Sequence, residues 1–186
     1  MPRPALILID IQNDYFEGGL MPLENMHHAA NNAALLLDAA RAQGIPVIHI
    51  RHIAASPNAP FFRPGTEGSE IHARVRPQPG EPVIEKARPN AFVGTNLEEA
   101  LRIADVTTVM LCGAMSQMCV DATARAAADL GFDVTLVEDA CAAAEVQFND
   151  VKVPAAFVHA AIMAPLAASY ATIVRTQDTL LLRRAV

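Results

Sequence analysis

The sequence lacks the cysteine pattern of a disulfide-bonded or zinc-binding protein. Its 186 residues include three cysteines, Cys112, Cys119 and Cys141, and no two of them have the C-x-x-C spacing. A small, odd number of cysteines disfavours a disulfide framework, and the missing spacing disfavours a zinc site. We therefore expect a protein of a reducing compartment and predict that the chain is cytoplasmic.

The sequence also lacks clustered positive charge and long apolar runs. Its net charge is -6, and lysine and arginine are scattered without a basic tract, which argues against a nucleic-acid partner. No apolar run approaches the ~20 residues that a membrane-spanning helix needs. The apolar stretch in MPRPALILID is too short for a signal peptide. We predict no nucleic-acid partner and no membrane association.

Short apolar runs alternate along the chain with alanine-rich helical patterns. We predict strands at 4–9, 46–51, 82–85, 106–112, 133–138 and 171–174, and helices at 28–43, 95–104, 118–130 and 151–168. This alternation is typical of an α/β protein whose mostly parallel sheet is covered on both faces. The length suits one domain, 1–186. Residues 54–81, rich in Pro, Gly, Asn and Ser, are expected to form a long functional loop.

Three ionisable residues follow predicted strands: Asp10, Lys86 and Cys119. Ligands of open parallel sheets bind at the carboxyl ends of the strands, so we expect these side chains to converge. Each alone has an ordinary explanation. An aspartate after a strand is commonly a turn residue, a lysine is usually a surface charge, and a cysteine is more often a small buried side chain. It is their shared position that indicates a site.

Together the three residue types suit nucleophilic catalysis. A thiol reacts as its thiolate, which a helix N-terminus and a neighbouring lysine both favour. A carboxylate within hydrogen-bond reach can take the thiol proton and return it to a leaving group. We therefore assign Asp10 as acid and base, Lys86 as electrostatic support and Cys119 as nucleophile. The N–H groups of the turn before Cys119 would hold an oxyanion.

Four segments resemble the isochorismatase-like cysteine hydrolases, a superfamily that includes nicotinamidases and related amidases. They are ALILIDIQNDYF at 5–16, EKARPNAF at 85–92, GAMSQMCVDATARAAADLGF at 113–132 and VEDACA at 137–142. The resemblance runs along nearly the whole chain. It implies a three-layer α/β/α sandwich with a six-stranded, mostly parallel, Rossmann-like sheet.

The same resemblance implies roles for individual residues. Asp10, Lys86 and Cys119 would be the catalytic triad, and Cys119 would form a thioester while an amine or ammonia leaves. A cis peptide bond would join Ala114 and Met115, turning the backbone amides of Met115 and Cys119 toward one oxyanion. No cofactor is implied.

The chain departs from the metal-dependent nicotinamidases that it resembles. Those enzymes carry an Asp-x-His pair after the second strand, where this sequence reads HIRHIAASPNAPFF. His49, His52 and His72 are present without that spacing, so we predict that no metal is bound. His52, just past a strand end, is placed to line the pocket.

Further residues near the motifs are candidates for binding a small-molecule substrate, with core packing as the alternative for the aromatic ones. The substrate-binding candidates are Gln12, Phe16, His52, Phe61, Asn90 and Gln117. The aromatic side chains would supply apolar walls, and the amides would orient the substrate. The stretch from Arg63 to Thr95 resembles a branch of the superfamily near streptothricin-hydrolase-like proteins, which points to an amide or lactam substrate.

Three functions remain open from the sequence. The first is a cysteine hydrolase that cleaves a C–N bond of an amide or lactam through a Cys119 thioester. The second is isochorismatase-type hydrolysis of a vinyl ether, which does not obviously require a thiol. The third is a non-catalytic redox role in which Cys119 pairs with Cys112. Proteins that resemble this chain are often dimers or larger oligomers, so we also expect a homodimer or a higher homo-oligomer.

Overall fold

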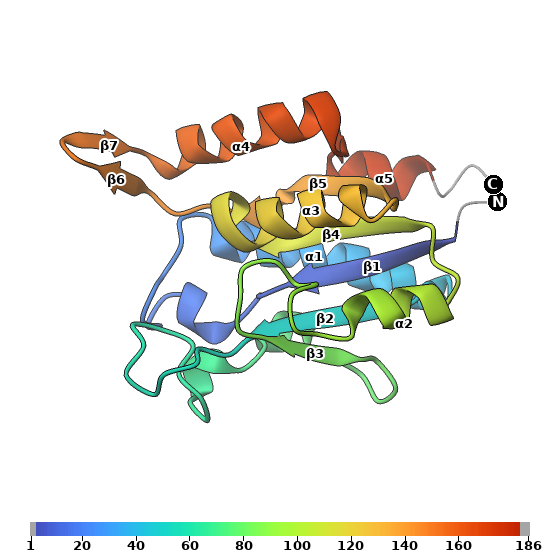
Figure 1. Cartoon of the computed structure of the whole chain (residues 1–186), viewed down its shortest axis with the longest axis horizontal. Coiled ribbons are helices and arrows are strands. Elements are labelled where there is room, and N and C mark those ends of the chain that lie inside the picture. Colours follow the sequence, from blue (N-terminus) through green and yellow to red (C-terminus); the bar gives the residue numbers. More distant parts are fainter. Residues whose placement is uncertain (1–2, 183–186) are drawn as a thin grey trace.

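A computed structural model describes residues 3–182 as one central sheet covered by helices. The sheet has six strands in the order β3-β2-β1-β4-β5-β8, and every neighbouring pair is parallel (Figure 1). The strands are β1 (Pro4–Ile9), β2 (Val47–His52), β3 (Val83–Lys86), β4 (Thr108–Ala114), β5 (Asp133–Ala142) and β8 (Thr172–Val174). The predicted six-stranded α/β/α architecture is confirmed.

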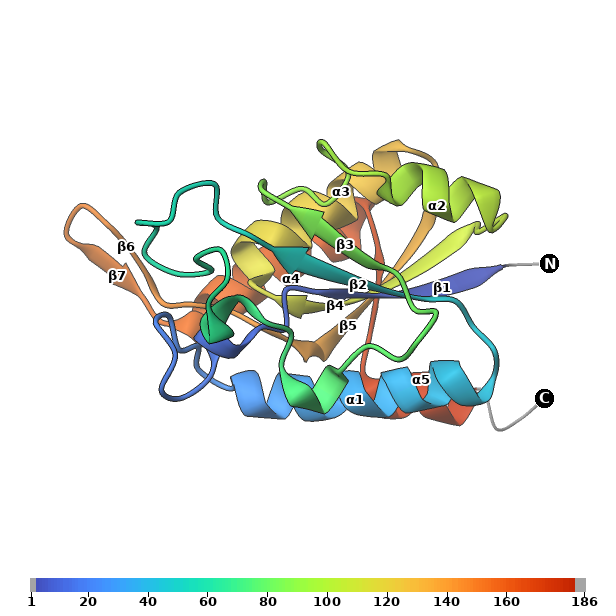
Figure 2. The ribbon, with the colours of Figure 1, turned by 90° about the horizontal axis from the view of Figure 1, so that it is seen from below.

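The helices form two layers on opposite faces of the sheet. Helices α1 (Met26–Ala42) and α5 (Thr176–Leu182) cover one face, and α2 (Leu97–Ile103), α3 (Asp121–Asp129) and α4 (Ala155–Ser169) cover the other (Figure 2). Because successive strand residues point to opposite faces, Leu6 and Leu8 of β1 pack in the α1 core while Ile7 and Ile9 pack in the α3 core. This double burial explains why β1 is apolar at consecutive positions.

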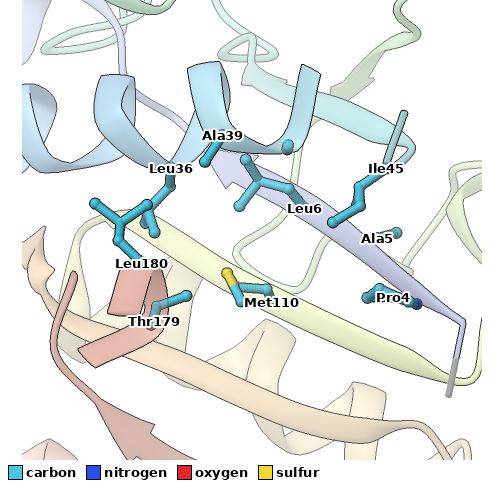
Figure 3. A pocket seen from close by; sticks show the side chains of 10 residues that line it. Pro4, Ala5, Leu6, Leu36, Ala39, Ile45, Met110, Thr179 and Leu180 are labelled. Atoms are coloured by element: carbon cyan, nitrogen blue, oxygen red, sulfur yellow. The ribbon is translucent and has the colours of Figure 1, made fainter. Parts of the chain in front are cut away.

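Where α1 and α5 pack over β1 and β4, the structure has a small apolar pocket (Figure 3). Pro4, Ala5, Leu36, Met110 and Leu180 are among the side chains around it. Pro4 and Ala5 begin β1, so this pocket lies toward the amino ends of the strands, away from the edge where the triad residues were expected. It is a packing defect of the α1 layer, lined by apolar atoms.

The C-terminal third differs from the sequence prediction. The expected helix 151–168 begins at Ala155, because β7 (Val151–Val153) pairs antiparallel with β6 (Val146–Phe148) in a hairpin. In Figure 1 this hairpin projects from the body of the protein ahead of α4. Strand β5 is also longer than predicted and reaches Ala142, and α5 was not predicted at all. No helix among the described residues is long and apolar enough to cross a membrane.

The expected helix 118–130 is two structures in succession. Residues Ser116–Val120 form a π-helical turn in which Val120 N–H donates to the Met115 carbonyl at 3.2 Å, and α3 then runs from Asp121 to Asp129. The peptide bond between Ala114 and Met115 is cis, as the resemblance implied. The loop 54–81 contains two short 3-10 turns, Glu67–Ser69 and Ala73–Val75.

Gly113 is required where β4 passes β1. Its φ is +129°, a conformation that L side chains rarely adopt. A Cβ at this position would lie 2.0 Å from the carbonyl oxygen of Ile9. Gly113 is paired with Ile9 in the sheet register, so neither backbone can move aside without breaking the pairing that carries the chain to Cys119.

We expect Gly113→Ala to lower the free energy of unfolding by about 3 kcal/mol or more, because backbone strain and a backbone clash add. Gly44→Ala is the matched control: Gly44 also has a positive φ, +63°, but has open space around it, so strain alone should cost about 1 kcal/mol. Urea unfolding of both variants measures the difference. Equal losses would show that close packing at Gly113 is unimportant.

Candidate active site

Four side chains meet at the carboxyl edge of the sheet. Asp10 directly follows β1, His52 and Lys86 end β2 and β3, and Cys119 lies in the π-helical turn after β4. His52 and Lys86 are register partners on adjacent strands. Asp10 has a left-handed backbone, with φ +50°, a conformation that aspartate tolerates better than most residues. The sheet therefore brings together residues that are far apart in the sequence.

The Lys86 ammonium group is the centre of the cluster. Its Nζ lies 2.7 Å from Asp10 Oδ2, 3.0 Å from His52 Nδ1 and 3.2 Å from Cys119 Sγ. The side chains of Lys86 and Asp10 are fully buried. An ammonium group has three hydrogens and no acceptor. It is hydrogen-bonded to His52 and Cys119 and forms an ion pair with Asp10, so one buried cation contacts an imidazole, a sulfur and a carboxylate.

Burial governs protonation of the acid and the thiol. Burial raises the pKa of Asp10, and the charge of Lys86 opposes that rise. Burial, followed by the charge of Asp10, also raises the pKa of the Cys119 thiol well above its usual value, with Lys86 acting in the opposite direction. Near neutral pH the thiol therefore keeps its proton. This corrects the expectation that a helix end holds Cys119 as a thiolate, because the desolvation of a 4% exposed sulfur outweighs that effect.

His52 is a neutral acceptor in this arrangement. Burial, with the charge of Lys86 as a second cause, lowers the pKa of His52 to about 4. Since an ammonium can only donate, His52 Nδ1 must accept from Lys86, and the ring proton resides on Nε2. His52 Nδ1 also lies 4.0 Å from Cys119 Sγ. His52 is thus in contact with the reactive group, as expected for a pocket residue.

The donor set of this cluster includes three groups that bind metals elsewhere. Donor atoms of Asp10, His52 and Cys119 all lie within 4.8 Å of one another. Lys86 Nζ lies within 3.2 Å of each of these donor residues, so a cation of the protein itself occupies the position that a metal ion would take. The other two candidate histidines lie elsewhere: His49 contacts Glu81 at 2.9 Å, and His72 stacks on Phe16.

Gln12 holds the backbone and has no amide hydrogen to offer a substrate. Its Nε2 donates to the carbonyls of His52 at 2.9 Å and Ser69 at 2.8 Å, and its Oε1 accepts from His52 N–H at 2.7 Å. Gln12 is fully buried. This corrects its assignment as a substrate-binding residue: it fixes the end of β2 against the loop 54–81.

Asp14 is a second anchor of that loop. Its Oδ2 accepts from Phe62 N–H at 2.6 Å, and its Oδ1 accepts from Leu20 N–H at 3.1 Å. A Cβ on Gly68 would lie 2.1 Å from Asp14 Oδ1, so a side chain there would displace the Asp14 carboxylate. The loop is therefore tied down at Phe62 and at Ser69 and is not free to take many conformations.

The remaining amide candidates also bind backbone. Asn90 Oδ1 accepts from Phe92 N–H at 2.9 Å within its own turn. Gln117 pairs with Ala144, donating from Nε2 to the carbonyl at 3.3 Å and accepting from its N–H at 3.4 Å. Both side chains are partly buried. Gln117 links the π-helical turn to the segment that leads into the β6–β7 hairpin.

Two aromatic residues that the sequence reasoning passed over lie closer to the cluster than those it chose. Phe62 has its ring centroid 5.8 Å from that of His52 and 4.6 Å from that of Tyr15. Burial, and then the charges of Asp10 and Cys119, raise the pKa of Tyr15. Phe61 packs behind them, 4.9 Å from Phe62. The pairs YF at 15–16 and FF at 61–62 were visible in the sequence, but which member faces the site depends on the loop path.

Phe16 is not part of this aromatic group. Its ring stacks on His72 at 3.7 Å between centroids and meets the edge of His27 at 5.1 Å. Phe16 and His72 border a hollow formed with Glu17–Leu20 and Gly68, which does not include the Lys86 cluster. The assignment of Phe16 as a wall of the substrate pocket is therefore corrected.

Comparison with known proteins matches nearly the whole chain to one family. The family description "Isochorismatase domain" matches residues 4–177. An uncharacterized isochorismatase family protein, YddQ of Bacillus subtilis, is 49% identical over 93% of this chain and 96% of its own. A streptothricin hydrolase of Streptomyces noursei is 38% identical over 73% of this chain and 48% of its own, and nicotinamidase 3 of Arabidopsis thaliana is 33% identical over 74% and 72%.

Among solved structures, a hydrolase from Oleispira antarctica that is described as a putative isochorismatase hydrolase superposes with a TM-score of 0.93. It is 43% identical, and the match covers 96% of both chains. The six-stranded sheet and its helical layers are therefore shared with a protein of known structure.

The low pKa of His52 makes a pH-dependent contribution to stability. The unfolded chain binds a proton at His52 below pH 6.5, whereas the folded chain does so only near pH 4. Stability from this group is therefore complete above pH 6.5 and is lost as the pH falls toward 4. Because the side chain is 19% exposed, we expect a loss of about 2 kcal/mol, less than the full shift would give.

Urea unfolding of the wild type and of His52→Asn between pH 4 and 7 measures this contribution. The variant should show a shallower decline of the unfolding free energy over that range, since the other titrating groups are common to both chains. Parallel pH dependences would show that His52 is not held neutral by the fold.

Proposed function

The chain belongs to the isochorismatase family, and on that basis we propose that it is a cysteine hydrolase that cleaves the C–N bond of a small-molecule amide or lactam. The observation that carries the proposal is the buried Lys86 ammonium in contact with Asp10 and Cys119, at 2.7 Å and 3.2 Å. The relatives named as a nicotinamidase and a streptothricin hydrolase support hydrolysis of this type.

The first half of the reaction forms a thioester. Asp10 removes the proton from the Cys119 thiol as Sγ attacks the carbonyl carbon, so no free thiolate accumulates. The carbonyl oxygen becomes an oxyanion, held by backbone N–H groups of the oxyanion loop, residues 114–119, with Met115 and Cys119 as the donors. The C–N bond then breaks, and the nitrogen takes the proton from Asp10 as the amine or ammonia leaves.

The second half returns the enzyme to its starting state. Asp10, again a carboxylate, removes a proton from water while the water oxygen attacks the thioester carbonyl. The C–S bond breaks, the acid product leaves and Asp10 returns its proton to Cys119. Lys86 stays charged throughout and offsets the negative charge, which moves between the carboxylate and the sulfur. The raised pKa values of Asp10 and Cys119 suit this exchange, because both groups compete for one proton.

Two alternatives predict different behaviour. Hydrolysis of a vinyl ether such as isochorismate does not require a thiol, so a variant without Cys119 would keep that activity. A redox pair of Cys119 with Cys112 is disfavoured by the fold, because the two residues belong to core clusters on opposite faces of the sheet. Amide hydrolysis gives a role to each of Asp10, Lys86 and Cys119, which neither alternative does.

We further propose that the chain functions as a homodimer or a higher homo-oligomer. Helix α4 is apolar on its outer side as well as its inner side: Phe157 is 66% exposed and is followed by exposed alanines. Helices that are apolar all round are normally covered. Light scattering should give at least twice the 19.9 kDa of one chain, and Phe157→Glu should shift the mass toward the monomer. A monomeric wild type would contradict this proposal.

Cys119→Ala should reduce amide hydrolysis at least a thousandfold, since nucleophile deletions in covalent hydrolases have effects of that size or larger. The measurement is ammonia release for a library of primary amides and the mass gain of one water for lactams, whose opened product keeps the nitrogen, followed by intact-mass analysis for an acyl adduct on Cys119. Cys141→Ala is the matched control, because Cys141 is buried and free but lies in β5 outside the cluster. It should keep both the adduct and the activity.

Unchanged melting temperature of Cys119→Ala by circular dichroism would show that the loss is chemical. Turnover of isochorismate by Cys119→Ala at the wild-type rate would instead establish the vinyl ether reaction. An adduct on Cys141 would contradict the assignment of the nucleophile.

A further inference from the structure

A second chain of polar contacts lies behind the oxyanion loop, outside the Lys86 cluster. Ser116 Oγ is 2.9 Å from His159 Nδ1 and 3.1 Å from the carbonyl oxygen of Ala142. The other end of the ring, His159 Nε2, is 3.5 Å from Glu138 Oε2, and Glu138 Oε1 is 3.2 Å from Arg175 Nε. Ser116 is fully buried, whereas the His159 side chain is 21% exposed.

The hydrogens in this chain can be assigned from the donor inventory. The Ser116 hydroxyl has a single hydrogen, and the Ala142 carbonyl can only accept. The hydroxyl therefore donates to Ala142, because otherwise two acceptor oxygens would face each other at 3.1 Å. It follows that His159 Nδ1 carries a hydrogen and donates it to Ser116 Oγ. A carboxylate, Glu138, faces the opposite end of the ring.

These contacts join one residue of the oxyanion loop to three other parts of the fold. Ser116 is in the π-helical turn, Glu138 and Ala142 are in β5, His159 is in α4, and Arg175 lies between β8 and α5. In Figure 1, α4 lies beside the beginning of α3. Met163 of α4 packs in the same core cluster as Cys119 and Val120. The position of α4 is thus transmitted to the turn that holds the nucleophile.

Ser116 is also the residue next to the first proposed oxyanion donor. The Met115 N–H precedes it by one residue, and the Met115 carbonyl accepts from Met118 N–H at 3.0 Å. A shift of Ser116 would move the peptide group that joins it to Met115, and the Met115 N–H lies on the other side of the same Cα. Displacing catalytic groups by about 1 Å can cost a hundredfold in rate, so the restraint on Ser116 bears directly on the transition state.

We propose that His159 is a positioning residue that sets the oxyanion loop through its Nδ1 hydrogen bond to Ser116. This inference rests on the proposed function, since it concerns the oxyanion of that reaction. His159 touches neither the substrate nor Cys119. Its role is to fix Ser116, and through it the direction of the Met115 N–H. Removing the His159 side chain should lower kcat and leave KM nearly unchanged, because the oxyanion forms only after the substrate has bound.

The test compares asparagine and glutamine at position 159, because their side-chain amide groups lie at different distances from the backbone. In His159→Asn the side-chain nitrogen is attached to Cγ, as Nδ1 is in histidine, and can donate to Ser116. In His159→Gln the nitrogen is one bond farther out. We expect His159→Ala, His159→Gln and Ser116→Ala each to lower kcat about tenfold or more with KM changed less than about threefold. His159→Asn should keep kcat within about threefold of the wild type.

The double variant Ser116→Ala/His159→Ala should be no slower than the slower single variant, because the two residues act as one unit. Additive losses would overturn the proposal. So would a kcat within twofold of the wild type for His159→Ala, or equal losses for His159→Asn and His159→Gln, which would indicate that the ring matters only for packing. Melting temperatures are measured alongside to separate kinetic from structural effects.

A second readout needs no substrate, so it separates this proposal from the proposed function. The rate at which iodoacetamide alkylates Cys119, followed by intact mass, reports the placement of the sulfur beside Lys86. It should change at least about threefold in His159→Ala and in Ser116→Ala, and remain at the wild-type value in His159→Asn. If the wild type hydrolyses no amide, the proposed function is wrong. The alkylation rates still show whether His159 and Ser116 affect the placement of Cys119. Equal alkylation rates in all four proteins would overturn the proposal for His159.

Discussion

The buried Lys86 ammonium is the interaction on which the site depends. Removing a charge from water is costly, and the cost is repaid only when every hydrogen of the ion finds a partner in good geometry. His52 and Cys119 provide hydrogen bonds at 3.0 Å and 3.2 Å, and Asp10 provides an opposite charge at 2.7 Å. Each of the four groups comes from a different strand end or turn, so the ammonium also fixes how β1, β2, β3 and the turn after β4 meet.

The environment of that ion explains why the thiol is not an anion at rest. Negative charge is already present on Asp10, and burial opposes a second one on Cys119. Lys86 can offset one charge fully but not two. The cluster therefore holds one proton between the carboxylate and the sulfur. This suits a reaction in which the proton moves at the moment of attack.

The sequence was sufficient to predict the sheet and the convergence of Asp10, Lys86 and Cys119, and the reasons are physical. Strand β1 is buried on both faces, so it reads as the uninterrupted apolar run PALILI, and its limits were predicted correctly. Asp10, Lys86 and Cys119 converge because parallel strands end at one edge. The hairpin β6–β7 was missed because its residues are mostly exposed and its strands have three residues each.

Side-chain partners were harder to predict than positions. Gln12, Asn90 and Gln117 have the right chemistry for binding a substrate, but their hydrogen bonds go to backbone groups that lie far away in the sequence or in a tight turn. The contact of His159 with Ser116 joins residues 43 positions apart. No local sequence pattern predicts such a pair, because the contact depends on how α4 packs against the π-helical turn.

The anchoring of the loop 54–81 has a consequence for how proteins with this architecture diversify. Asp14 secures Phe62 and Gln12 secures Ser69, while residues 55–58 between His52 and Phe62 are exposed. Insertions or replacements in that short stretch leave both anchors and the Lys86 contacts intact, so they cost little stability. Variation confined there would change the exposed surface between the two anchors and leave the buried contacts of Lys86 as they are.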